Sequence, residues 1–365
     1  MALTYERLNQ NTDVTTTRTL LHEIIPLTGT LVSGTYGTFP DEENIKNYTH
    51  GMFQSVYDYP YLSSSANHIF DLTLGYDETS ELSGTTSVQN KKKINIYNQF
   101  SQVLLGYSAS TNTTEIFESD LDITDDNNQM KSCMFISFTR LITKDQVKKG
   151  SFSLTLGKGA WGAPFDTQIT LQDLAANVDG TQVGTAVGGE YAVLFDATAS
   201  LSTETPSSSY GVIFYQAGIV ALSASAIWSG VTDFASGAAT ILSGTIADGP
   251  ARTVNYMQAT ASISASCDAL RHRIANLSYN NTTEINSTIY FCRIPVNKFN
   301  YSSNPTYVTG SKIRVKNVAT DDPVAYVTTI GLYNASNELL ATAKVSEPLR
   351  KDPTNELTLR VRLDY

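Results

Sequence analysis

Charged side chains are scarce in this sequence. Asp, Glu, Lys and Arg make up 16% of the 365 residues, against about 25% in typical soluble proteins. Uncharged polar residues such as Thr, Ser, Asn and Tyr are abundant instead, and they are easier than charges to remove from water when a neighbouring protein covers them. The composition favours a protein whose surface is largely covered by other subunits. A secreted β protein is the alternative with a similar composition.

Basic residues are fewer than acidic ones, 25 against 35, which gives a net charge of −10 and an isoelectric point near 4.9. We expect no nucleic-acid partner, because binding to phosphates requires a concentrated positive surface. The single basic run, 91–93, is too short to form such a surface. We interpret it as the solvated start of a helix.

Cysteine is also rare. Cys133, Cys267 and Cys292 are odd in number and far apart, which fits neither a disulfide framework nor a metal site. We predict free, buried thiols in a reducing compartment. The first residues lack the basic and then apolar pattern of a secretory signal peptide. We therefore interpret the several Asn-x-Ser/Thr triplets as a product of composition and not as glycosylation sites.

Recognisable catalytic motifs are missing. The chain has no Gly-x-Ser-x-Gly, His-Glu-x-x-His or Cys-x-x-Cys motif. The tripeptide Gly-Lys-Gly at 157–159 lacks the rest of a phosphate-binding loop, and we interpret it as a turn. The sequence therefore predicts no catalytic residue, no cofactor-binding residue and no cofactor. We expect the four histidines to be ordinary core or surface residues, because none stands at a short ligand spacing: His22, His50, His68 and His272.

The strongest candidate for a metal site is the acidic run 120–128, because clustered carboxylates suit Ca²⁺. An EF-hand loop requires glycine at its sixth position and glutamate at its twelfth. This run has Asp125 and Lys131 there. We interpret it as a solvated acidic loop and predict no metal ligand.

Long hydrophobic runs are absent as well. The nearest candidate, 212–228, is interrupted by Gln216 and Gly218, whereas a membrane-spanning helix needs about 20 apolar residues. We predict two buried strands joined at 216–218, and no membrane association.

A change in charge divides the chain. Residues 151–270 hold two basic and nine acidic residues, a net charge of −7, which leaves −3 for the rest. The same stretch is rich in Ala, Gly, Ser and Thr. We predict that 151–270 is an acidic inserted β domain, and that 1–150 and 271–365 together form a discontinuous β-rich main domain.

The predicted fold class is mainly β (α+β), with a few helices. Pro40 and an acidic first turn predict one helix over 41–57, and apolar spacing predicts a second over 92–107. The aromatic residues of the second helix are expected to pack in the core. Five strands are predicted in the main domain: 20–35, 69–76, 134–143, 288–294 and 313–318.

The last forty residues are the most regular part of the sequence. Two β-rich runs flank the turn-forming residues 334–337, which predicts a hairpin. Residues 357–364 then alternate between aliphatic and polar side chains, the pattern of a half-buried strand. We expect Leu357, Leu359, Val361 and Leu363 to face a buried surface, and the strand to offer an edge for pairing.

Several stretches resemble a known family. The C-terminal run Y-V-T-T-I-G-L-Y-N-x-x-N-E-L-L-A-x-A-K, followed by P-x-x-K-D-P, is similar to a virion structural protein family of large contractile-tailed phages, the cyanophage-type myoviruses. The resemblance covers about a third of the chain and implies a component of the particle. Four further stretches are similar to the same family: N-H-I-F-D-L-T-L-G-Y at 67–76, K-K-I-N-I-Y-N-Q-F-S-Q-V-L-L-G at 92–106, F-I-S-F-T-R-L-I-T-K-D-Q-V-K-K-G at 135–150 and Y-G-V-I-F-Y-Q-A-G-I at 210–219.

The sequence thus predicts a non-enzymatic structural subunit of a tailed-phage virion, most simply in the tail–baseplate or neck region. Its expected partners are other virion structural proteins and copies of itself, with assembly in the host cytoplasm. Two alternatives stay open: a capsid decoration or vertex protein, and a receptor-binding or glycan-degrading tail module.

Overall fold

The chain divides into two compact units in the computed structural model. Unit 1 comprises residues 1–20 and 284–365, and unit 2 comprises residues 21–283. Strands hold 45% of the residues and helices 16%, which confirms the predicted mainly β class. The structure describes residues 5–28, 44–84, 87–108, 113–121, 128–173, 176, 183–197, 209–236, 250–302, 308–309, 312–313, 320 and 322–365.

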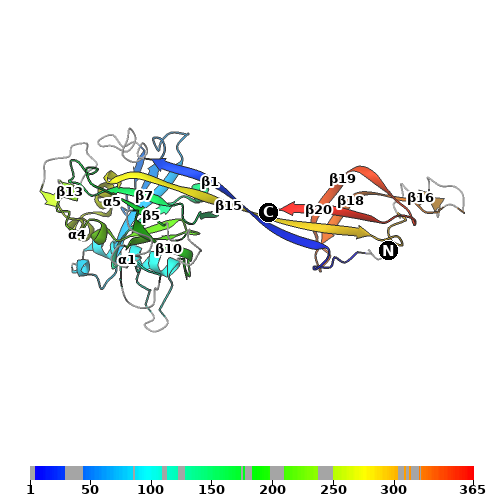
Figure 1. Ribbon diagram of the computed structural model, residues 1–365, viewed down its shortest axis with the longest axis horizontal. Helices are drawn as coiled ribbons and strands as arrows, with labels where there is room; N and C mark the ends of the chain where they lie inside the picture. Colours follow the sequence, from blue (N-terminus) through cyan, green and yellow to red (C-terminus); the bar gives the residue numbers. More distant parts are fainter. Residues whose placement is uncertain are drawn as a thin grey trace. The chain divides into compact units, whose positions relative to one another are not determined.

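Two long strands belong to both units. β1 (Val14–Thr28) and β15 (Ile274–Ile294) each cross the boundary between them, so the chain enters and leaves unit 2 through strands (Figure 1). The predicted strand over 20–35 lies within β1 as far as Thr28, and its remainder is outside the described residues.

Unit 2 is built on the larger part of a 14-stranded sheet, in the order β1-β15-β7-β8-β10-β11-β12-β5-β4-β3-β2. β6 pairs with β15, β9 pairs with β10, and β13 and β14 form a small separate sheet. The strands have these bounds: β2 Ile45–Asn47, β3 Gln54–Tyr57, β4 His68–Tyr76, β5 Ser132–Phe138, β6 Gln146–Val147, β7 Ser153–Gly157, β8 Gln168–Gln172, β9 Gly184–Ala186, β10 Gly189–Asp196, β11 Ser209–Phe214, β12 Ile219–Leu222, β13 Ala235–Ser236 and β14 Ala251–Arg252.

β4 and β5 pair antiparallel without interruption from Phe70↔Phe138 to Tyr76↔Ser132. Both strands are buried along almost their whole length, which explains why their sequences are nearly continuous apolar runs. The strand predicted over 69–76 is confirmed. The one predicted over 134–143 ends at Phe138, because the short helix α2 follows it.

The helices of unit 2 are short apart from α1. Their bounds are η1 Glu81–Ser83, a 3-10 turn, α1 Val88–Leu104, α2 Arg140–Thr143, α3 Ala224–Ile227, α4 Val254–Ala259 and α5 Ile263–His272. α1 and α5 both contact β4. No helix in the described ranges has both the length and the apolar character that crossing a membrane requires.

The helix predicted over 92–107 is confirmed as α1. It begins earlier than predicted, because the Ser87 hydroxyl accepts a hydrogen bond from the Asn90 amide at 3.2 Å and caps its N-terminus. Gly75 on β4 allows the close approach of α1: a Cβ there would lie 2.6 Å from the Lys93 carbonyl oxygen.

The helix predicted over 41–57 is wrong for the residues that the structure describes, 44–57. They form β2 and β3, joined by a turn in which the Gly51 amide donates to the Tyr48 carbonyl at 2.9 Å. Gly51 has φ +61°, a conformation that ends a helix and suits a turn. Its presence in the middle of the segment outweighs the helical spacing of the apolar residues.

The hydrophobic core cluster consists only of unit 2 residues, from Ile45 to Tyr279. As predicted, aromatic residues of α1 contribute to it: Tyr97 is buried, and Phe100 stacks on Phe135 with ring centroids 4.3 Å apart. Tyr107 lies beyond the end of α1 and is 57% exposed, so its expected core position is wrong.

The domain boundaries predicted at 150 and 270 do not coincide with the units. β12 pairs with β5, and β7 pairs with β15, so residues 151–270 supply interior strands of the sheet that residues on either side also form. The change in charge marks a change in composition along one sheet. Within the stretch, the two strands predicted over 212–228 are confirmed as β11 and β12, with α3 following them.

Unit 1 contains the C-terminal strands. The predicted hairpin is confirmed as β18 (Ala325–Tyr333) and β19 (Leu339–Lys351), and the closing strand as β20 (Leu357–Asp364). β20 pairs antiparallel with β15 from Ser287↔Asp364 to Ile294↔Leu357, which also confirms the strand predicted over 288–294. β16 (Val308–Thr309) and β17 (Lys312–Ile313) form a small ribbon. The strand predicted over 313–318 lies outside the described residues after Ile313.

Candidate interaction surface

The histidines, the first candidates for catalysis, all have ordinary partners. No group of three or more His, Cys, Asp or Glu residues in the described ranges could hold a metal ion. Each imidazole has a nitrogen close to one protein group: His22 with Thr282 Oγ1 at 3.1 Å, His50 with the Met52 amide at 3.1 Å, His68 with Asp71 at 2.8 Å and His272 with the Trp161 carbonyl at 3.2 Å.

The acidic run 120–128 falls mostly on residues 122–127, which lie outside the described part of the chain. Of its two ends, Asn128 donates a hydrogen bond to the Asp120 carboxylate at 2.9 Å. The turn predicted at 157–159 lies a few residues later. Gly157 ends β7, the Lys158 amide donates to the Thr167 carbonyl at 2.7 Å, and the Ala163 amide closes a turn on the Ala160 carbonyl at 3.0 Å.

All three cysteines are free, as predicted. Cys133 and Cys267 are buried, and burial raises the pKa of both thiols far above the ordinary value. Cys292 is only partly buried, which differs from the expectation, and burial again raises its thiol pKa. Because the thiolate is the reactive form, none of the three has the lowered pKa of a nucleophile.

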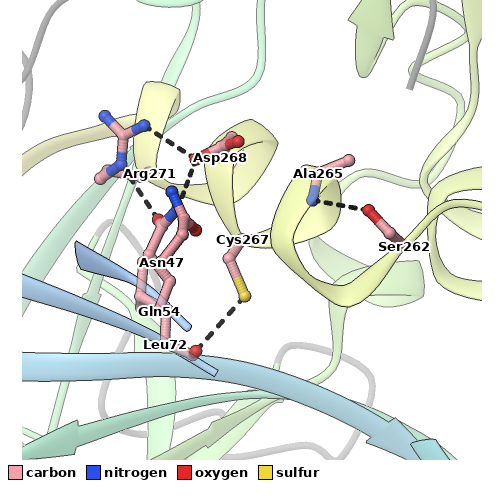
Figure 2. Close-up of polar contacts among 8 residues, drawn as sticks. All are labelled: Asn47, Gln54, Leu72, Ser262, Ala265, Cys267, Asp268 and Arg271. Carbon is pink, nitrogen blue, oxygen red and sulfur yellow. Dashed lines mark hydrogen bonds and ion pairs between the residues drawn. The ribbon is translucent and has the colours of Figure 1, made fainter. Parts of the chain in front are cut away.

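A buried polar network joins α5 to β3 in unit 2 (Figure 2). Asp268 Oδ1 accepts from Gln54 Nε2 at 2.5 Å and from Arg271 Nη2 at 3.0 Å, and Arg271 Nε donates to Gln54 Oε1 at 3.3 Å. Gln54 Nε2 also donates to Asn47 on β2 at 3.0 Å. Sequence reasoning missed this group. The sequence feature that could have revealed it is the pair Asp268 and Arg271, three residues apart on a helix, together with Gln54 on a strand.

This network is structural. Gln54, Asp268 and Arg271 are each 0% exposed, so no substrate reaches them. Two further contacts fix α5: the Ser262 hydroxyl caps its first turn at Ala265, and Cys267 donates to the Leu72 carbonyl on β4 at 3.3 Å (Figure 2). The network aligns α5 with strands β2, β3 and β4.

Two more buried cations in unit 2 hold backbone carbonyls. Arg273 donates to the carbonyls of Phe234, Asp233, Gly157 and Gly159 at 2.8–3.0 Å. Burial lowers its pKa to about 10. Its donors are turned to the protein interior, so Arg273 is not positioned to bind an external anion.

Lys93 is the second buried cation. It donates to the carbonyls of Gln258 at 2.5 Å and Ala261 at 2.8 Å, and burial lowers its pKa to about 8. The interpretation of 91–93 as a solvated helix start is therefore wrong at Lys93, which is 0% exposed. Asp268, Arg271, Arg273 and Lys93 are thus each bound to other groups of unit 2.

The surface features of unit 1 are different. In the hairpin, apolar residues recur at half-buried positions of β18 and β19 that pair across the two strands. The cross-strand pairs are Ile330↔Ala343 and Leu332↔Ala341 and, beyond a register shift, Val327↔Leu349. We call these positions the hairpin face, with these members: Val327, Ile330, Leu332, Ala341, Ala343, Val345 and Leu349.

The opposite side of the hairpin also exposes large side chains. Tyr326 is 47% exposed, Tyr333 is 45% exposed and Leu339 is 52% exposed. The turn is ordered by the Asn334 side chain, whose Oδ1 accepts from the amides of Ser336 and Glu338, both at 2.9 Å.

The strand edges of unit 1 are open along the residues that the structure describes. β18 and β19 pair only with each other, and β20 pairs only with β15. β20 alternates as predicted: Val361 is buried, Leu357, Leu359 and Leu363 are half-buried, and the residues between them are exposed. Three of the four aliphatic side chains are thus less buried than a closed core would make them.

Ten charged side chains of unit 1 are paired with one another. Five ion pairs lie within it: Arg18–Glu284, Asp13–Arg293 at 3.0 Å, Glu6–Lys298 at 2.6 Å, Arg350–Asp352 at 3.2 Å and Arg362–Asp364 at 2.7 Å. Unit 1 holds twelve basic and ten acidic residues, a net charge of +2, which leaves −12 for unit 2 out of the chain's −10.

Comparisons with known proteins add no relative: no family model, no curated protein and no solved structure matches this chain. The candidate site is therefore defined by geometry, as the hairpin face and the open edges of β18, β19 and β20.

Proposed function

We propose that this protein is a non-enzymatic structural subunit of a tailed-phage virion, in the tail–baseplate or neck region, and that it acts by protein–protein assembly. Its partners are other virion structural proteins and copies of itself, and it joins the particle in the host cytoplasm. It binds neither nucleic acid nor a membrane.

One observation carries the proposal: unit 1 presents open strand edges and a half-exposed apolar hairpin face. An isolated two-stranded hairpin is only marginally stable in water, and open edges are templates for pairing with another chain. A protein with such a unit is suited to assembly. The resemblance of its C-terminal sequence to a family of virion proteins supplies the setting.

The chemistry of unit 2 supports the non-enzymatic part of the proposal. Its buried Asp268, Arg271, Arg273 and Lys93 bind other parts of the same unit and not a cleft. An active site needs a nucleophile or a base within reach of a substrate. Asp268, the carboxylate of this group, is 0% exposed and therefore enclosed.

The proposal is tested by cryo-EM of phage particles whose genome encodes this chain. The expected result is density for the chain in the tail–baseplate or neck, with unit 1 in contact with neighbouring subunits. Density on the capsid surface would favour a decoration or vertex protein instead. A chain that is missing from purified particles by mass spectrometry would overturn the proposal.

A separate assay addresses the receptor-binding or glycan-degrading alternative. Purified protein is incubated with polysaccharide from the host surface, and reducing ends are measured. We expect no release of reducing ends above a heat-denatured control. Release by the native protein would favour an enzyme of the tail.

A further inference from the structure

We propose that unit 1 is completed by unit 1 of other copies of this chain, packed against its hairpin face, so that the protein is an obligate homo-oligomer. This inference deepens the proposed function by naming the partner of the assembly surface. It rests on the proposed function only for its place in the particle, because self-association can be measured with the purified protein.

The first step is that unit 1 has little core of its own. Among its described residues, the buried hydrophobic side chains are Ile294, Val324, Ala325 and Val361, and none of them belongs to the core cluster. Domains of this size normally bury most of the apolar surface that the unfolded chain exposes. Unit 1 therefore needs apolar surface from elsewhere to reach ordinary stability.

The second step is that unit 1 exposes large apolar side chains of the kind that association buries. An interface between obligate partners resembles a domain core cut in half and is more apolar than an ordinary surface. On the hairpin face, seven apolar side chains are only half-buried within one copy: Val327, Ile330, Leu332, Ala341, Ala343, Val345 and Leu349.

The third step concerns charge and identifies the occupant as a copy of the same chain. Unit 1 is close to neutral, and its ion pairs are internal. Two copies can therefore meet through unit 1 with little repulsion and without a partner of opposite charge. Unit 2 carries a net charge of −12, which opposes contact between copies through that part.

The fourth step is that the hairpin face needs a partner from the time the chain is synthesised. A surface that a different virion protein covered only late in assembly would leave unit 1 incomplete from synthesis onward. Its exposed edges would then promote aggregation. A copy of the same chain is present at the same concentration from the start and forms a closed symmetric assembly.

The test compares two neighbouring substitutions on β19. Ala343→Arg places a charge on the hairpin face, opposite Ile330, whereas Thr342→Arg places the same charge on the exposed side, opposite Gly331. Full-length wild type and both variants are examined by native mass spectrometry and light scattering at micromolar concentrations. Trp161 and Trp228 are the chain's two tryptophans and lie in unit 2, so their fluorescence checks that unit 2 remains folded.

The expected result is an oligomer for the wild type and for Thr342→Arg. Ala343→Arg should weaken association by about 100-fold or more, because it buries an unpaired charge at the contact, with tryptophan emission unchanged. An oligomer that resists Ala343→Arg would overturn the proposed face, and so would one that both variants disrupt equally.

A monomeric wild type would overturn self-association. If its hairpin were protected from hydrogen exchange in solution, another part of the same chain would cover the face. If the hairpin became protected only in the particle, a different virion protein would be the occupant. That result would overturn self-association and leave the proposed function intact. An oligomer of purified protein whose chain is missing from the particle would support self-association and overturn the proposed function.

Discussion

Unit 2 and unit 1 are both β-rich, yet they are stabilised in different ways. Unit 2 encloses a large cluster of apolar side chains and buries cations such as Lys93, Arg271 and Arg273 at 0% exposure. Unit 1 contributes nothing from its described residues to that cluster. It too buries a cation, Lys351 at 0% exposure, but the basic side chain in each of its five ion pairs is exposed. Unit 2 has a hydrophobic core of the kind that stabilises an independent domain. The described residues of unit 1 have little such core, and we propose that a partner supplies the missing apolar contacts.

The change in charge along the sequence at 151–270 does not mark the boundary between the two units. Net charge differs strongly between the units, −12 against +2, yet the change in composition at 151–270 falls inside one sheet. Sheets are held together by backbone pairing and apolar burial, and neither requires a particular net charge. The comparison of the units thus depends on burial, and burial is what the following experiments change.

The largest effect is expected from deletion of residues 357–365. The deletion removes β20 and its eight-pair ladder with β15. With Val361 buried and three other aliphatic residues half-buried, the lost burial is worth on the order of 4 kcal/mol, a large share of a domain's net stability. Unit 1 should lose its protection from hydrogen exchange, while the tryptophan-monitored transition of unit 2 keeps its midpoint. A matching loss in unit 2 would show that the units fold as one.

The next effect is the removal of a buried charge partner in unit 2. Arg271→Met leaves Asp268 buried without its ion pair, which should destabilise unit 2 by about 3–5 kcal/mol. Urea denaturation followed by tryptophan fluorescence measures the change. The matched control is Arg362→Met in unit 1, whose partner Asp364 is half-exposed, and it should leave the unit 2 midpoint unchanged. If the two variants behave alike, burial does not distinguish the units.

Much of the fold was predictable where the local pattern was strong. The hairpin around Asn334–Asn337, the alternating strand β20, β4 and helix α1 all follow from spacing and turn chemistry that the backbone obeys directly. The helix predicted over 41–57 failed because the conformation of a single glycine decided the segment.

The buried network of Gln54, Asp268 and Arg271 was beyond sequence reasoning because it joins residues more than 200 positions apart. The open edges of unit 1 were anticipated only for β20. That the hairpin adds a second open surface follows from pairing and burial, which a linear pattern does not contain.

The buried Lys93 should make the stability of unit 2 depend on pH. Its pKa falls to about 8 in the folded protein, because burial disfavours the charged form. The ordinary value in an unfolded chain is about 10.4. Between these values the unfolded state binds more protons, so the stability of unit 2 should rise with pH from about 8 upward.

The measurement is the unfolding midpoint of unit 2 between about pH 8 and 9.5, below the range in which tyrosine ordinarily titrates. Lys93→Met should abolish the rise. Lys92→Met is the matched control, because Lys92 reaches the His50 carbonyl from an exposed position, and the rise should persist in it. If the stability of unit 2 still rises with pH in Lys93→Met, the rise is caused by groups other than Lys93.

The smallest effect is expected at the turn of the hairpin in unit 1. Asn337 adopts φ +62°, a left-handed conformation that Asn and Gly tolerate and that β-branched residues avoid. Its amide donates to the Asn334 carbonyl at 3.1 Å, which closes the turn between β18 and β19. Asn337→Val should therefore lower the local opening free energy of the hairpin by about 1–2 kcal/mol, whereas Asn337→Gly should change it by only a few tenths of a kcal/mol. Hydrogen exchange of the β18 and β19 amides measures both, with the tryptophan transition of unit 2 as the internal reference. Equal exchange in the two variants would mean that contacts outside the turn, such as the hairpin face of a neighbouring copy, hold the hairpin closed.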